Sequence, residues 1–186
     1  MIFVRIIGID LAGLDANPSG FALLERRRFT TQNLYTDEEL LDRCEASRPA
    51  VVAIDAPLSL PRRGGLREAD LSLIKRGFRV FPPKFGSMRS LTKRGSALAK
   101  KIREMGIKVI EVHPRTSGLL LFGTAERKKW MKKLKQLGFK FDGGGSRHEV
   151  DAALAALTGL LYLKGKVEKV GRPEEGIIII PEKRCL

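Results

Sequence analysis

Two short apolar runs, Val4–Gly13 (VRIIGIDLAG) and Val51–Pro57 (VVAIDAP), each carry an aspartate at the point where the apolar pattern breaks off. Runs of β-branched residues without polar alternation are typical of central strands in a sheet that is covered on both faces. Ligand sites of such sheets form beyond the carboxyl ends of the strands. We therefore expect each strand to deliver one carboxylate, Asp10 or Asp55, to such a site.

If the two strands are neighbours, Asp10 and Asp55 lie side by side. Two ionised carboxylates about 4 Å apart repel by roughly 4 kcal/mol at an effective dielectric constant near 20, so such a pair usually shares a proton or binds a cation. A divalent metal site is therefore the first hypothesis. The alternative is that each aspartate only caps a turn or the following helix.

The composition indicates one globular domain without a membrane segment. The chain has 186 residues, of which 43% are hydrophobic, and its longest apolar stretch, 152–163, is too short to span a bilayer. No signal-peptide pattern precedes the first strand, so we expect a cytoplasmic protein. Cys44 and Cys185 lack metal-ligand spacing and are interpreted as reduced thiols. The 30% of charged residues, with only two Asn and two Gln, favours a thermophilic source.

The charge of the chain points to a polyanionic partner. Lys and Arg number 35 against 21 Asp and Glu, which gives a formal net charge of +14. The basic residues cluster at 26–28, 62–63, 84–94 and in a helix that contains Lys128, Lys129, Lys132, Lys133 and Lys135. Each cluster alone is also typical of a solvated face. Together with carboxylates gathered at one sheet end, they favour a nucleic acid, DNA or RNA, as the partner.

Hydrophobic periodicity and turn residues predict the order of the elements. The expected strands span 4–10, 20–25, 29–35, 50–55 and 107–112, with a late edge strand at 177–180. The expected helices span 36–48, 66–76, 91–105, 124–138 and 148–164. No linker divides the chain, so we predict a single domain over residues 1–186, with an insertion at about 59–90.

A third group of polar residues opens the last long helix, in the segment 146–157 (SRHEVDAALAAL). His148 and Asp151 are three residues apart, so they share a helix face and can reach one site. Glu149 stands at the capping-box position behind Ser146, which gives it a structural role. The alternatives are that Asp151 only complements the helix dipole and that His148 is a capping or supporting histidine.

The order of these motifs resembles the ribonuclease H-like fold: hydrophobic-Gly-Ile-Asp, a hairpin, a helix, a second strand ending in Asp, and a last helix with His-x-x-Asp-Ala. More closely, it is similar to RuvC-type Holliday junction resolvases and to an uncharacterised family of predicted nucleases related to them. The resemblance implies an α/β fold with a mixed five-stranded sheet flanked by helices. It also matches Asp10, Asp55 and Asp151 to metal ligands, and His148 to the position three residues before the last ligand.

The predicted-nuclease family also carries Glu-Val-His-Pro, found here at 111–114, and an Arg-x-x-Asp with a following Gly and Pro-rich turn, found at 67–83. Glu111 and His113 end the inner strand next to the second acid, so we expect them at the rim of the site, where they could touch substrate or a metal; alternatively, Pro114 makes His113 a turn residue. The second strand ends in Asp where the resolvases have Glu, and the insertion lacks a counterpart there. Junction specificity is therefore not carried over.

The activity that the resemblance implies is hydrolysis of a phosphodiester bond with two Mg²⁺ or Mn²⁺ ions, held by Asp10, Asp55 and Asp151. These three carboxylates are expected to converge in one pocket. Resolvases act as dimers, so a homodimer is a further expectation. The alternatives are a nucleic-acid-binding protein of the same fold without catalysis, and a phosphotransferase of the actin and sugar-kinase type. Residues 8–13 resemble the first phosphate loop of that superfamily, but no second glycine-rich loop follows.

Overall fold

A computed structural model describes residues 4–186; residues 1–3 of the predicted domain lie outside the described part. The strands are β1 (Arg5–Asp10), β2 (Ser19–Glu25), β3 (Arg28–Leu34), β4 (Val51–Asp55), β5 (Val109–Val112), β6 (Lys140–Asp142), β7 (Val167–Arg172) and β8 (Gly176–Pro181). The helices are α1 (Asp37–Ser47), α2 (Glu68–Lys75), α3 (Ser87–Glu104), α4 (Pro114–Phe122), α5 (Arg127–Gln136) and α6 (Arg147–Leu163).

The described strands form one mixed sheet in the order β6-β3-β2-β1-β4-β5-β8-β7. The five strands predicted up to 112 form its contiguous centre, and β4 lies parallel to β1 as expected. The predicted count of five is wrong, because the described part holds eight strands. The short β6 adds to β3, and the β7–β8 hairpin adds to β5. The strand predicted at the edge, 177–180, is therefore internal.

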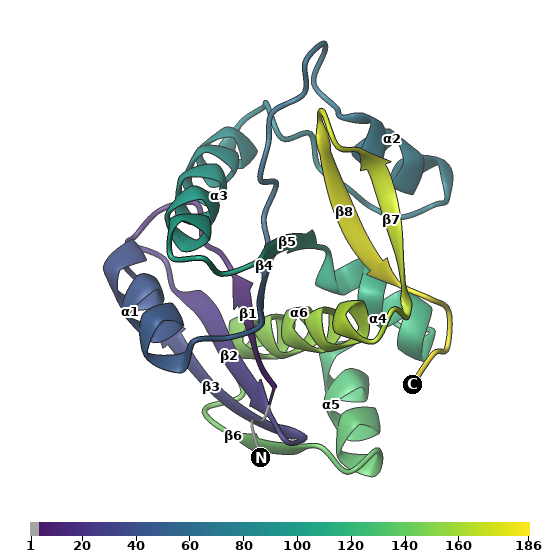
Figure 1. Cartoon of the computed structure of the whole chain (residues 1–186). Helices are drawn as coiled ribbons and strands as arrows, with labels where there is room; N and C mark the ends of the chain where they lie inside the picture. Colours follow the sequence, from purple (N-terminus) through teal and green to yellow (C-terminus); the bar gives the residue numbers. More distant parts are fainter. Residues whose placement is uncertain (1–3) are drawn as a thin grey trace.

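Helices cover both faces of the sheet, which explains why its central strands are apolar throughout (Figure 1). Alternate residues of a strand point to opposite faces. Ile6 of β1 and Val51 of β4 belong to the core cluster formed with α4, α5 and α6. Ile7 and Ile9 belong to the cluster formed with α1 and α3. The N-terminal end of α6 therefore lies over the carboxyl ends of β1 and β4.

Two glycines allow α6 to approach the sheet closely. A Cβ atom on Gly8 of β1 would clash with the backbone of Ala152 and Ala156, and one on Gly20 of β2 would clash with the backbone of His148. On the helix side of this contact, the small side chains of the alanine run in α6 also permit the close approach. The close approach holds the first turns of α6 against the strand that carries Asp10.

The segment after β4 and the segment after β5 contain helices that organise the site. In the predicted insertion, α2 packs Ala69 and Leu73 against β7 and β8. After β5, α4 begins with Pro114 and ends at Gly123 in the left-handed conformation. These are ordinary start and stop signals, although no helix was expected between residues 112 and 124. None of the described helices is both long enough and apolar enough to cross a membrane.

We predict that Gly8→Ala lowers the free energy of unfolding by about 3 kcal/mol, because the new methyl group would clash with the backbone of Ala152 and Ala156 in α6. Denaturant titration measures this. Gly13→Ala is the matched control, since its Cβ atom would have its nearest neighbour at 3.6 Å, an ordinary contact. Equal stability of the two variants would show that α6 does not depend on this approach.

Candidate active site

The register of the two central parallel strands brings the first two predicted acids together. Asp10 is paired with Asp55, and each is the last residue of its strand. Residues in register on neighbouring strands point to the same face. Gly8 and Ala53, two residues earlier, face α6, so both carboxylates also project on the side that α6 covers.

The negative charges of Asp10 and Asp55 are only partly balanced by nearby positive groups, and the pKa values of both carboxyls show this. Burial raises the pKa of Asp10 to about 6; the charge of Asp151 adds to the rise, and a hydrogen bond with His148 offsets part of it. Burial also raises the pKa of Asp55 well above its usual range, and the charges of Asp10 and Asp151 add to this rise. The charge of Arg127 offsets part of the rise at Asp55.

His148 contacts Asp10 directly. Its Nδ1 lies 2.7 Å from Oδ2 of Asp10, and its Nε2 accepts a hydrogen bond of 3.2 Å from Nε of Arg147. Because Nε2 accepts, the ring proton sits on Nδ1 and is donated to Asp10. His148 therefore fixes the orientation of the Asp10 carboxylate.

Asp151 lies on the same end of α6 but is engaged elsewhere. Arg127 binds it with two parallel hydrogen bonds, Nε to Oδ1 at 2.8 Å and Nη2 to Oδ2 at 2.6 Å. Within residues 4–186, no three His, Cys, Asp or Glu side chains are grouped closely enough to hold a metal ion as they stand. The structure thus places Asp10 and Asp55 as a neighbouring pair, whereas Asp151 is paired to an arginine and does not line their cavity.

A small cavity of about 230 Å³ adjoins the carboxylate pair. Asp10, Asp55, Glu111 and His113 line it, and apolar residues from several segments, among them Phe81, form the remaining wall. His113 Nδ1 lies 2.7 Å from the hydroxyl oxygen of Thr116. Burial lowers the pKa of His113 to about 4, so this ring is neutral at pH 7.

Glu111 lies at the same sheet end but faces the other way. It is in register with Ile54, one residue before Asp55, so the alternation of β4 and β5 directs it to the opposite face. Both of its oxygens are hydrogen-bonded by the guanidinium of Arg67, at 2.6 and 2.8 Å, and one also accepts from the amide of Leu58. Glu111 also lines the cavity beside Asp10 and Asp55, but both of its oxygens are engaged by Arg67.

Arg67 is the centre of a buried ion cluster that holds the insertion. Its side chain is 1% exposed and also binds Asp70, whose side chain is 1% exposed. Glu111 is 6% exposed. Burial raises the pKa of Glu111, and Arg67 counteracts this rise. The cluster joins the start of α2 to β5 and, through Leu58, fixes the chain that leaves Asp55.

Sequence reasoning did not identify Arg127 as a site residue. It is one of several basic residues on α5, 24 positions before Asp151, and no local spacing distinguishes it from its neighbours. Arg67 had a signal in the Arg-x-x-Asp spacing at a helix start, which places the two charges on one face. Its burial and its pairing with Glu111 depend on contacts across 44 residues, which no local pattern shows.

The donor set of the site fits a magnesium-type ion. Carboxylate oxygens are the protein ligands that Mg²⁺ prefers, and such ions are commonly held by only one or two carboxylates, with waters and substrate phosphates completing the shell. Asp10 and Asp55 supply two carboxylates on one face, and burial, together with the like charge of Asp151, raises the pKa of both. A divalent cation would relieve this repulsion.

The fold of the chain is ribonuclease H-like, as its similarity to two solved structures shows. Thermus thermophilus RuvC in complex with a Holliday junction substrate is 14% identical, with a TM-score of 0.54 over 87% of this chain and 96% of that chain. A second structure of Thermus thermophilus RuvC is 15% identical, with a TM-score of 0.50 and the same coverage. The predicted similarity to the RuvC fold is confirmed.

A family described as "Protein of unknown function (DUF429)" matches residues 8–176, and the chain belongs to this family. The matched range includes the end of β1 with Asp10, all of β4, the predicted insertion and α6. No curated protein matches the sequence.

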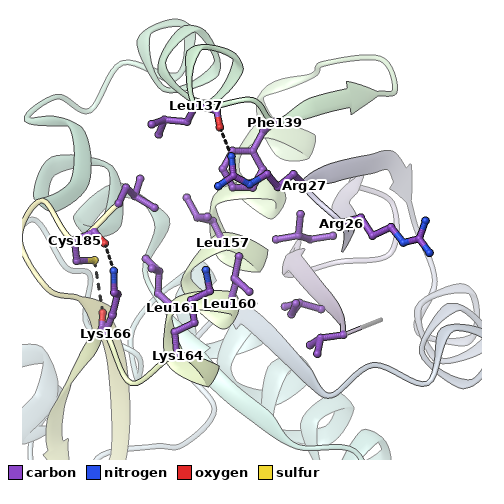
Figure 2. Close-up of a pocket in the computed structure, with 14 residues that line it drawn as sticks. Arg26, Arg27, Leu137, Phe139, Leu157, Leu160, Leu161, Lys164, Lys166 and Cys185 are labelled. Carbon is purple, nitrogen blue, oxygen red and sulfur yellow. Dashed lines mark hydrogen bonds between the residues drawn. The ribbon is translucent and has the colours of Figure 1, made fainter. Parts of the chain in front are cut away.

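A second hollow, of about 520 Å³, lies at the other end of α6 and has a different character (Figure 2). Leu157 and Leu161 of α6 form part of its apolar wall, and Arg27 crosses it to donate a hydrogen bond to the carbonyl of Leu137. No aspartate or glutamate is among its lining residues. It therefore differs from the cavity beside β1 and β4, which two aspartates line.

The raised pKa of Asp10 predicts that this carboxylate destabilises the fold at neutral pH. Because its folded-state pKa of about 6 exceeds the ordinary value of 3.8, the penalty is present above pH 6 and disappears as the pH falls below 3.8. Asp10→Asn should raise the free energy of unfolding by about 3 kcal/mol at pH 8 in metal-free buffer, and by almost nothing at pH 3. The exposed Asp42→Asn is the control; a gain that did not depend on pH would refute the explanation.

Arg67→Met should lower the free energy of unfolding by about 3–5 kcal/mol at pH 7, because it leaves two buried carboxylates without their partner. Arg76→Met removes the exposed pair with Glu168 and should cost about 1 kcal/mol or less. Chemical denaturation of both variants measures the difference. Similar losses would mean that the buried cluster does not hold the insertion.

Proposed function

We propose that the protein is a metal-dependent nuclease that hydrolyses phosphodiester bonds of DNA or RNA. The observation that carries this proposal is the in-register pair of Asp10 and Asp55 on adjacent parallel strands, with a third carboxylate on α6 close enough to raise the pKa values of both. Such a concentration of poorly compensated negative charge is what a divalent-ion site requires. A RuvC-like fold and a net charge of +14 support a polyanionic substrate.

In this proposal Asp10 and Asp55 hold Mg²⁺ or Mn²⁺, and Asp151 completes the set for a second ion. When bound, such ions stabilise the charge that develops on a phosphodiester and lower the pKa of water. His148 keeps the Asp10 carboxylate in place through its Nδ1–H. Its Nε2 is the atom that can receive a proton once Arg147 no longer donates to it.

The other predicted residues take supporting roles. Glu111 anchors Arg67 and thereby the segment that follows Asp55. His113, neutral at pH 7, lines the cavity beside the carboxylates, where it can contact substrate. The predicted homodimer and cytoplasmic location stay predictions, and sedimentation velocity would test the first.

A second candidate function, nucleic-acid binding without catalysis, has one observation in its favour. Asp151 is neutralised by Arg127, and the described residues show no ready three-ligand group. In that case the basic surface would bind nucleic acid, while the acid pair would bind no metal. Metal binding at Asp10 and Asp55 distinguishes the two candidates.

Incubation with single-stranded, duplex, branched and RNA–DNA hybrid substrates, with Mg²⁺, Mn²⁺ or EDTA, tests the proposal. We expect metal-dependent cleavage of at least one substrate, reduced at least about 100-fold in Asp10→Asn and in Asp55→Asn, because each change removes a charged metal ligand. Asp42→Asn, an exposed change of the same chemistry, should cleave at the wild-type rate.

Tight, salt-sensitive binding without cleavage, and without metal binding, would favour the non-catalytic candidate. Cleavage that survives in Asp10→Asn would place the activity elsewhere or in a contaminant. Either result contradicts the proposed site.

A further inference from the structure

A basic groove of about 620 Å³ runs between α5 and the start of α6. Met131 and Val150 supply apolar contacts, and five basic side chains surround them: Arg127, Lys128, Lys132, Lys135 and Arg147. No acidic residue lines the groove. Its charge is therefore complementary to a chain of phosphates.

The structure divides the basic cluster of α5 into two groups. Lys128, Lys132 and Lys135 are spaced by four and three residues, share one face and line the groove. Lys129 instead pairs with Glu126 at 2.6 Å, and Lys133 donates to the carbonyl of Phe122. At 1.5 Å per residue, the groove face spans about 10 Å, roughly three base steps of 3.4 Å along one strand.

Arg127 connects this groove to the carboxylate site. It lines the groove, its side chain is 43% exposed, and it holds Asp151, which is 11% exposed. Its charge also acts on Asp10 and Asp55. A planar guanidinium binds a phosphate with the same two parallel hydrogen bonds that it gives to a carboxylate. Arg127 can therefore exchange one anion for the other with a small movement.

We propose that the groove binds the phosphate backbone of a nucleic-acid strand, and that Arg127 then leaves Asp151 for a phosphate, which frees Asp151 to bind a metal ion. This inference rests on the proposed function and adds a regulation of the same site. Without nucleic acid, Arg127 neutralises Asp151 and competes with the ion. With nucleic acid bound, the competition ends, so substrate and metal strengthen each other's binding, and linkage requires this coupling to be reciprocal.

Among the groups near Asp151, Arg127 is the one that can compete with a metal ion for this carboxylate. Asp10 and Asp55 are like charges and cannot hold it. His148, one turn earlier on α6, is occupied by Asp10 and Arg147. Glu149 lies in the capping box and accepts from Thr31 and the amide of Gly144. Arg127 is thus the cation whose removal should change the metal affinity of this carboxylate.

The test is calorimetric titration with Mn²⁺ of the full chain, alone and saturated with a 12-nucleotide phosphorothioate DNA whose integrity is checked on a gel. Without DNA, Arg127→Gln should bind Mn²⁺ about fivefold more tightly than wild type, the scale expected for loss of a partly exposed ion pair. DNA should tighten Mn²⁺ binding to wild type and leave Arg127→Gln almost unchanged.

Lys129→Gln removes the same charge from the same helix outside the groove, and should match wild type in both titrations. Lys132→Gln should weaken DNA binding without changing Mn²⁺ affinity in the absence of DNA. Arg127→Lys keeps the charge but loses the two-pronged contact, so a smaller gain in Mn²⁺ affinity is expected. Circular dichroism verifies the fold of each variant.

Equal or weaker Mn²⁺ binding by Arg127→Gln, or DNA coupling that persists in it, would overturn the exchange while leaving the metal site intact. Absence of Mn²⁺ binding in wild type and in Arg127→Gln, with and without DNA, would overturn the proposed function itself. The two failures are therefore distinguishable.

Discussion

The pairing of β1 with β4 imposes the constraint on which the site depends: two carboxylates end neighbouring strands on the same face. The register aligns Asp10 with Asp55, and burial keeps water from screening their repulsion. A sheet centre built for stability would place apolar or hydrogen-bonded residues there. A bound cation would offset the repulsion between the two carboxylates. The function is therefore inferred from this pair of residues and not from the fold alone.

The surrounding structure keeps this repulsion from opening the sheet end. Gly8 lets α6 lie directly on β1, which brings His148 within hydrogen-bonding distance of Asp10. On the other face, Arg67 and Glu111 form a buried ion pair that fixes the chain after Asp55. Removing one partner of such a pair leaves an uncompensated buried charge. The site is therefore held by helix packing on one side and by an ion cluster on the other.

Much of the centre of the fold could be predicted from sequence, because hydrophobic periodicity and capping residues are local signals. The apolar runs ending at Asp10 and Asp55, the hairpin between them, and the capping box at Ser146 all lie where expected. Elements that depend on distant partners were missed. The three-residue β6 has no hydrophobic pattern typical of a strand, and it forms by pairing with the edge of β3. The pairing of Arg127 with Asp151 likewise depends on tertiary packing, so the sequence showed a candidate ligand but not its competitor.

Anomalous diffraction from crystals grown with Mn²⁺ tests the central claim most directly, because it locates the ion without assuming an activity. We expect a peak between the carboxylates of Asp10 and Asp55, with metal–oxygen distances near about 2.1 Å, and its loss in Asp10→Asn. A structure at millimolar Mn²⁺ in which this pair holds no ion would contradict the account, whatever other surface sites were occupied.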